Sequence, residues 1–79
     1  MKQSKNLFIL AEIPAGEEVF IAELNSQPEM CNRLREMGFC EDALIKCVDN
    51  NGSMLICQVC NSRIGINQTL ARQISVSKN

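Results

Sequence analysis

Short apolar runs separated by turn residues recur along the chain, and this pattern is typical of β-strands joined by tight turns. The clearest run is EVFIAEL at residues 18–24, which is rich in strand-forming residues and follows a turn that contains Pro and Gly. Two further runs within residues 43–59 flank Asp-Asn-Asn-Gly at 49–52, and Asn-Gly between apolar runs is a strong hairpin signal. This part of the chain therefore predicts a strand and a β-hairpin.

The C-terminal part repeats the pattern in shorter elements. Residues 61–67 predict a short strand that opens with a turn at Asn61-Ser62. A helical turn is expected at Thr69–Arg72, and a last strand passes through Ile74 and Val76. Three or four short strands are therefore expected after residue 43.

Residues 25–39 carry the signals of a helix. Ser26 and Glu29 match the capping-box pattern at its start, and Pro28 suits the first turn. Gly38 follows the last apolar position, where a left-handed glycine commonly ends a helix. We expect Phe39 to return the chain to the core.

The predicted helix has one apolar stripe, made by Met30, Leu34 and Met37 at spacings of four and three. Such a stripe is more often the core face of a helix than a partner surface. Arg33 and Arg35 then lie on the outer faces, where solvated arginine is the default and partner contact is the functional alternative.

The order of strand, helix and several short strands predicts a mainly β (α+β) fold with one helix inserted after the first long strand. Many short strands within 79 residues favour a closed or nearly closed small barrel. No linker, repeat or low-complexity segment divides the chain. We expect one domain over residues 1–79.

Charge and composition narrow the class of partner. Eight basic and nine acidic side chains give a net charge of −1. General nucleic-acid binders are basic because phosphate neutralisation supplies most of their affinity, so no nucleic-acid partner is expected.

The apolar run at residues 7–11 is too short for a secretory signal, and no stretch approaches a membrane span. These features predict no direct membrane insertion, and the odd number of five cysteines, which cannot all pair, predicts a reducing cytoplasm.

Cys57 and Cys60 have the spacing of a metal knuckle or a redox pair. In a strand over residues 55–60 their side chains alternate to opposite faces, and Gln58-Val59 suits neither a knuckle turn nor a helix N-terminus. With no His, all zinc ligands would have to come from five cysteines that contain one Cys-x-x-Cys pair. We expect one of the two cysteines to pack inward and the other to be partly exposed.

Catalytic motifs are missing from the sequence. There is no His for a triad, and no nucleophile elbow, phosphate loop or zinc-protease motif is present. Glu41 and Asp42 are adjacent carboxylates in a loop, but no base or nucleophile pairs with them. The sequence therefore predicts a protein that is not an enzyme, with no catalytic residues and no cofactor.

Four motifs, taken in order, resemble those of the FeoA family, small cytoplasmic proteins of bacterial ferrous iron uptake. They are IPAGEEV at 13–19, RLREMGF at 33–39, VCNSRIGI at 59–66 and the alanine-x-x-isoleucine-x-valine pattern at 71–76. Each is weak alone, but their order and spacing make the match specific. The resemblance covers about residues 7–76.

Three positions depart from the family pattern. Asn61 stands where the family usually has Gly, and Asn tolerates left-handed backbone best after Gly, so we expect Asn61 to take that conformation. Ala43 replaces a common Gly, so the preceding loop is expected to have a different shape. Met54 replaces a frequent Pro.

The resemblance implies an SH3-like small β-barrel and a non-enzymatic role. The implied partner is FeoB, a membrane ferrous-iron permease with a cytoplasmic G-protein domain. Grooves for proline-rich peptides are lined with aromatics, and three Phe without Trp or Tyr cannot build one. We expect a monomer or weak oligomer that acts by protein–protein interaction.

Contacts are usually made by loops and turns held on a rigid scaffold. The candidate partner-binding residues are Arg33, Arg35, Glu41, Asp42, Asn61, Ser62 and Arg63. An alternative of a different class is a cysteine-based metal-binding or redox module. Its candidate ligands are Cys31, Cys40, Cys57 and Cys60.

Overall fold

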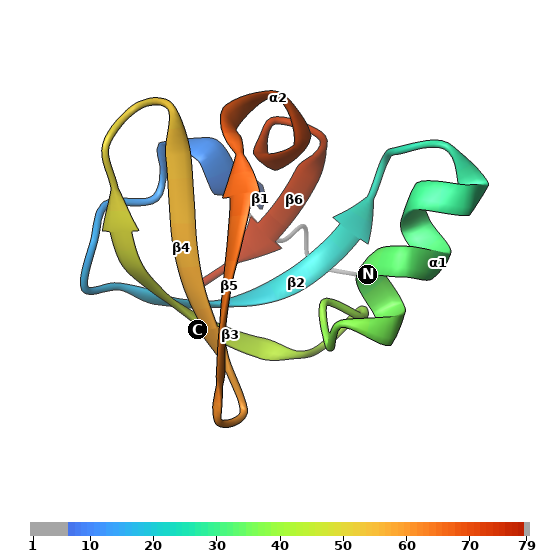
Figure 1. Cartoon of the computed structure of the whole chain (residues 1–79), viewed down its shortest axis with the longest axis horizontal. Coiled ribbons are helices and arrows are strands. Elements are labelled where there is room, and N and C mark those ends of the chain that lie inside the picture. Colours follow the sequence, from blue (N-terminus) through green and yellow to red (C-terminus); the bar gives the residue numbers. More distant parts are fainter. Residues whose placement is uncertain (1–6, 79) are drawn as a thin grey trace, which may run out of the picture.

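The computed structural model describes residues 7–78, which form one curled antiparallel sheet with one main helix (Figure 1). In chain order the elements are β1 (Leu7–Ile9), the 3-10 helix η1 (Leu10–Glu12), β2 (Glu18–Leu24), α1 (Pro28–Glu36), β3 (Leu44–Asn50), β4 (Met54–Val59), β5 (Ser62–Asn67), the short helix α2 (Gln68–Ala71) and β6 (Ile74–Ser77). Within these residues no helix is long and apolar enough to cross a membrane.

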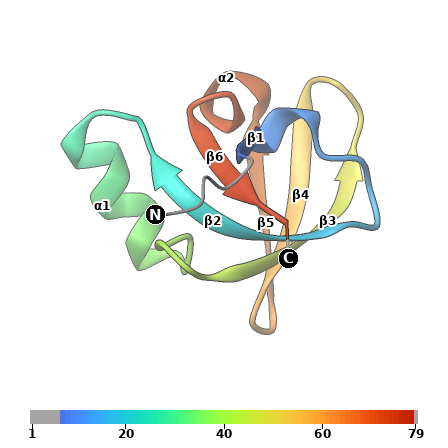
Figure 2. The same cartoon turned by 180° about the vertical axis from the view of Figure 1, so that it is seen from behind.

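The six strands are ordered β1-β6-β2-β3-β4-β5, and each neighbouring pair is antiparallel. Figures 1 and 2 show from opposite sides how the sheet curls, with α1 at one end and the β4–β5 hairpin extending away from α2. β1 and β5 are the edges and do not pair with each other within residues 7–78. The mainly β prediction is confirmed, but the barrel is left open between these two edges.

Most predicted elements are confirmed. β2 has the same limits as the strand predicted at 18–24. β3 and β4 form the predicted hairpin, whose turn is held by Asn51 Oδ1, which accepts hydrogen bonds from the backbone N–H groups of Ser53 (2.9 Å) and Met54 (3.0 Å). The short strand β1 and the 3-10 helix η1 were not predicted, because an apolar run of five residues is too short to show the periodicity of a strand or a helix.

The second helix begins one residue before the predicted helical turn. Asn67, the last residue of β5, is its N-cap, and its Oδ1 accepts a 2.8 Å hydrogen bond from the Leu70 N–H. The side chain of Asn67 thus satisfies a backbone donor that has no partner inside the helix. This cap fixes where the chain leaves β5 for the last strand.

The core fills the inside of the curled sheet and is almost entirely aliphatic. Phe39 is its largest side chain and is fully buried, as expected. η1 contributes Leu10 and Ala11, and the inward positions of the strands contribute most of the rest. The further buried members are Ile13, Val19, Ile21, Leu34, Ile45, Cys47, Leu55, Cys57, Val59, Ile66, Ala71, Ile74 and Val76.

The start of α1 differs from the predicted capping box. The N-cap is Gln27, whose side chain makes no capping hydrogen bond, and Pro28 occupies the first turn as expected. The Ser26 hydroxyl instead donates a 2.6 Å hydrogen bond to Oε1 of Gln73, which lies 47 residues away in the chain. A long-range partner has therefore replaced the local one that the sequence pattern suggested.

The buried face of α1 is rotated from the predicted stripe. Leu34 is fully buried and Met30 is half-buried, but Met37 is 41% exposed. Cys31 takes the remaining core position, and its thiol donates to the Ser26 carbonyl at 3.3 Å. Met37 is the C-cap residue directly after the last helical residue, Glu36, so the predicted stripe is wrong at its C-terminal end.

Candidate functional site

The end of α1 is a Schellman motif centred on Gly38. Its φ is +99°, and its N–H donates to the Arg35 carbonyl at 3.1 Å. The Phe39 N–H donates to the Leu34 carbonyl at 2.8 Å, and both side chains belong to the core. These are the two hydrogen bonds and the apolar contact of the motif. The left-handed glycine predicted at this position is confirmed, and it directs the chain into the following loop.

A tight turn over Cys40–Ala43 forms the loop. The Ala43 N–H donates to the Cys40 carbonyl at 3.0 Å, and the Asp42 N–H donates to the Ile21 carbonyl of β2 at 2.8 Å. Asp42 has a φ of 71°, in a region that non-glycine residues rarely adopt. The loop therefore turns through a left-handed Asp42, and β2 holds it in place. The different loop shape expected from Ala43 stays a prediction.

An ion pair ties this loop back to α1. Arg35 Nη2 lies 2.9 Å from Glu41 Oε2 and Arg35 Nε lies 3.2 Å from Oε1, so the contact is bidentate. The hydrogen bond from Arg35 lowers the pKa of Glu41, and the same contact raises the pKa of Arg35. Both side chains are nearly half exposed, so solvent screens their attraction. The pair orients two candidate contact residues more than it stabilises the fold.

The β4–β5 turn has only two residues, Cys60 and Asn61, between the paired residues Val59 and Ser62. The left-handed residue is Cys60, with a φ of 55°, so the prediction for Asn61 is wrong by one position. The register of the hairpin decides which residue comes first in the turn, and this register is not visible in the sequence. Asn61, Ser62 and Arg63 are all exposed, as a contact surface requires.

An open groove of about 590 Å³ runs between the loop and this turn. Cys40 and Gly38 line it on the loop side and Cys60 lines it on the hairpin side. The remaining lining residues are Glu18, Ala43, Leu44, Ile45, Lys46, Gln58 and Val59. The groove lies between the two predicted contact segments that follow residue 39, and their neighbours Cys40, Ala43 and Cys60 line it. The predicted contact residues themselves are not among its lining, namely Glu41, Asp42, Asn61, Ser62 and Arg63.

Outward-facing strand residues form one polar row beside the groove. Glu18 is paired with Lys46, Lys46 with Gln58, and Gln58 with Arg63. Directly paired residues share a face, so this row joins the predicted residue Arg63 to three that the sequence analysis missed. Their signal was their alternation with the buried residues Ile45 and Cys57, but placing them together also needs the strand register.

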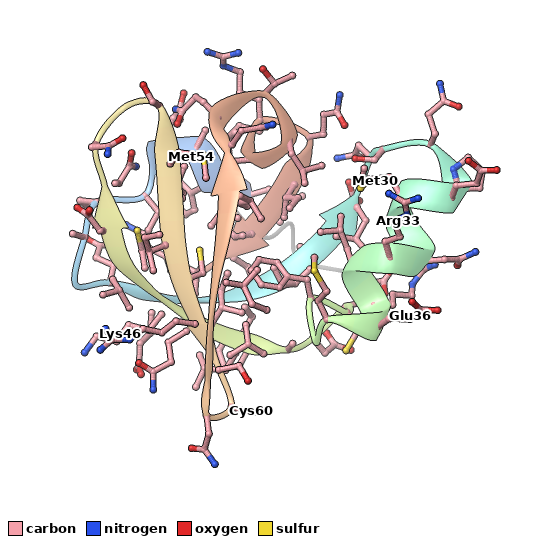
Figure 3. All side chains as sticks on the ribbon, viewed as in Figure 1. Met30, Arg33, Glu36, Lys46, Met54 and Cys60 are labelled. Carbon is pink, nitrogen blue, oxygen red and sulfur yellow. The ribbon has the colours of Figure 1, made fainter. Side chains whose placement is uncertain are left out.

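The helix arginines differ in their relation to this groove. Arg35 is joined to the loop through Glu41. Arg33 is exposed on α1, and Figure 3 shows it and Glu36 on the helix, away from the hairpin that carries Cys60. Arg33 has no ion pair within the described part of the chain. Among the predicted contact residues, an ion pair joins Arg35 to Glu41, and strand pairing places Arg63 beside the polar row.

The cysteines divide into buried and exposed groups. Cys31, Cys47 and Cys57 are buried, while Cys40 and Cys60 are exposed, which confirms the expected split within the Cys57–Cys60 pair. Burial raises the pKa of Cys57 to about 12, opposite to the shift of a reactive thiol. Over residues 7–78 no three Cys, His, Asp or Glu side chains come close enough to hold a metal ion together. The four candidate ligands therefore do not form one site.

Comparison with known proteins identifies related domains. The family model for the FeoA domain matches residues 9–78. The crystal structure of an iron uptake regulatory protein, FeoA, superposes with a TM-score of 0.84 at 20% identity, over 91% of this chain and 97% of that one. FeoA from Chlorobium tepidum has a TM-score of 0.82 at 18% identity, over 89% and 69% of the two chains. A search of curated proteins finds no match.

A third structure is that of zinc-complexed FeoA from Stenotrophomonas maltophilia, described as a procaryotic SH3 domain protein. It has a TM-score of 0.72 at 24% identity, over 86% of this chain and 87% of that one. These likenesses confirm the SH3-like fold, and the family match covers nearly the whole chain. The chain therefore belongs to the FeoA family, which is associated with ferrous iron transport.

Proposed function

We propose that this chain is a non-enzymatic, cytoplasmic accessory protein of bacterial ferrous iron uptake. It would act by binding the G-protein domain of an FeoB-like transporter. Family membership supports this role, and so does the description of the Stenotrophomonas maltophilia protein as a candidate ferrous iron transport activating factor. The observation that carries the proposal is the groove bordered by the loop and the β4–β5 turn. The Arg35–Glu41 ion pair joins α1 to this loop.

The groove has the composition of a protein contact site. Leu44 lies on its surface and is 47% exposed. Lys46 and Glu18 supply charge at the same surface. An apolar centre with a polar surround is the usual arrangement of protein interfaces. We expect an apolar side chain of the partner to rest against Leu44.

Affinity for the isolated G-protein domain of the transporter tests this surface. Leu44→Asp should weaken binding at least tenfold, because burial of a carboxylate at the centre of an interface is unfavourable. Met54→Asp is the matched control, because Met54 is also the first residue of its strand, is 41% exposed and lies outside the groove. Equal effects of the two substitutions would contradict the placement of the contact at the groove.

A charge swap separates direct contact from loop positioning. Arg35→Glu alone breaks the ion pair, whereas Arg35→Glu with Glu41→Arg restores a pair with reversed charges. Recovery of affinity in the double variant means that the pair only positions the loop. Continued loss means that one of the two side chains contacts the partner. Unchanged affinity after Arg33→Glu plus Arg35→Glu would remove α1 from the contact surface.

The transport role itself has a separate test. Ferrous iron uptake is measured in cells with and without this protein while the amount of transporter is held constant. We expect lower uptake when the protein is missing or carries Leu44→Asp. Equal uptake in all three cases would overturn the role in transport, whatever the binding assay shows.

A further inference from the structure

Two buried cysteines lie directly opposite each other in the β3–β4 ladder. Cys47 of β3 and Cys57 of β4 are direct register partners, and neither has any exposed surface. Residues directly opposite each other in an antiparallel pair have side chains on the same face of the sheet. Both side chains belong to the core cluster, so the two sulfur atoms lie on the face of the sheet that is turned to the core.

The backbone hydrogen bonds show which kind of pair this is. The Cys47 N–H donates to the Glu17 carbonyl at 2.9 Å, and the Cys47 carbonyl accepts from the Gly16 N–H at 2.7 Å. Both polar groups of Cys47 are therefore turned away from β4, so Cys47 and Cys57 form a non-hydrogen-bonded pair. In such pairs the Cα atoms lie about 4.5 Å apart, within the range of about 4.4–6.8 Å found in disulfides.

The ladder is irregular beside this pair, which gives the strands room to adjust. The register shifts between Cys47 and Asp49, as at a β-bulge. Opposed Cβ atoms lie about 4.5–5.5 Å apart, whereas a disulfide brings them to about 3.8 Å. A movement of about 1 Å is needed, and the irregular segment after Cys47 can absorb it.

We propose that Cys47 and Cys57 are a redox-sensitive dithiol, which closes to an intrachain disulfide when β3 and β4 open briefly in the presence of a low-molecular-weight disulfide such as oxidised glutathione. In this exchange one thiolate attacks the oxidant and releases one molecule of thiol. The second thiolate then attacks the mixed disulfide and releases another. The two protein sulfurs lose two electrons and two protons and form one S–S bond, and the oxidant becomes two thiols.

Burial explains why the closed fold keeps the pair reduced. Desolvation raises the pKa of Cys57 to about 12 and also raises the pKa of Cys47, so little thiolate is present, and the oxidant has no path to either sulfur. The adjacent pair in the ladder is Lys46 with Gln58, and both of these residues line the groove on the outer face. The disulfide would therefore hold together the two strands that support one part of that groove.

The test uses a variant in which Cys31, Cys40 and Cys60 are replaced by Ser, so that only the proposed pair remains. It is incubated with oxidised glutathione, with and without urea below the unfolding midpoint, and its intact mass is followed. We expect a mass loss of about 2 Da, faster in urea because opening limits the reaction. The product should have a Tm higher by roughly 10 °C, because a disulfide across residues 47–57 restricts the unfolded chain.

The control retains Cys31 and Cys57, with Cys47→Ala and the two exposed cysteines replaced by Ser. It has two buried thiols that are not register partners, so it should take up glutathione without losing mass by closure. A Cys47–Cys57 variant that stays reduced or stops at the mixed disulfide would overturn the proposal. Equal closure by the control would do the same, as would a lower Tm after oxidation. None of these results depends on the proposed role in iron transport.

Discussion

Of the four glycines, Gly38 is the one at which an added methyl group should disturb the fold most. Its φ of +99° is rarely available to residues with a side chain. An added Cβ would also lie 2.9 Å from Cγ1 of Val59, which is 4% exposed and packed in the core. Gly38→Ala therefore combines an unfavourable backbone conformation with a steric clash between the end of α1 and β4.

The two contributions can be estimated separately. Left-handed backbone costs an L-residue roughly 1–2 kcal/mol, and overpacking a core typically costs about 1–3 kcal/mol. The smaller entropy of the unfolded Ala chain offsets about 0.4–1 kcal/mol. We expect Gly38→Ala to lower the free energy of unfolding by roughly 2–4 kcal/mol, which corresponds to a Tm decrease of the order of 10–20 °C for a domain of this size.

Gly16 provides a matched control because its φ is also +99° and nothing lies within 4 Å of its Cβ position. Gly16→Ala should lose only the backbone part, roughly 1 kcal/mol. Urea unfolding of the two variants and the parent, at constant m-value, measures the difference. If both variants lose the same stability within about 0.5 kcal/mol, the contact with Val59 does not constrain the loop and the reasoning fails.

Three further comparisons test other parts of the structure. Cys60→Gly should raise stability by roughly 1 kcal/mol because it relieves the φ of 55°, whereas Asn61→Gly should not; equal shifts of the urea midpoint would contradict the assigned turn. Leu34→Ala should lower the free energy of unfolding by about 2–5 kcal/mol because Leu34 is fully buried, whereas Met37→Ala should lower it by less than about 0.5 kcal/mol because Met37 is exposed. Similar losses for both variants on thermal unfolding would support the apolar stripe that the sequence predicted. Arg35 lowers the pKa of Glu41, so the stabilisation from this pair is complete above the unfolded-state pKa of about 4.3 and is lost as the pH falls through the lower folded-state pKa. The stabilities of the parent and Glu41→Gln should therefore converge in acid, and a difference that persists unchanged at about pH 2 would argue against the ion pair as its source.

The fold was largely predictable because its signals are local. Alternation of apolar residues marked β2, and the Asn-Gly turn marked the β3–β4 hairpin. Gly38 directly after the apolar positions of a helix was sufficient to predict its end. The errors at the start of α1 and in the β4–β5 turn have a common cause. Ser26 bonds a residue from the far end of the chain, and the position of Cys60 depends on hairpin register.

The candidate site was predictable as a set of segments but not as a surface. Arg35 and Glu41 are six residues apart, which is not a spacing at which helical side chains meet, and only the reversal at Gly38 brings them together. The local signal of Lys46 and Gln58 was limited to their alternation with buried residues in their strands. Their place beside the groove comes from cross-strand pairing, which sequence pattern does not specify.

The pairing of β1 with β6 has a consequence for how this domain can be joined to other chains. Leu7 and Ser77 are register partners, so the polypeptide enters and leaves the described fold at nearly the same point. A domain with adjacent ends can be inserted into a loop of another protein without separating the halves of its host. It should also tolerate circular permutation, with a short linker from Ser77 to Leu7 and new ends at the exposed turn around Gly52.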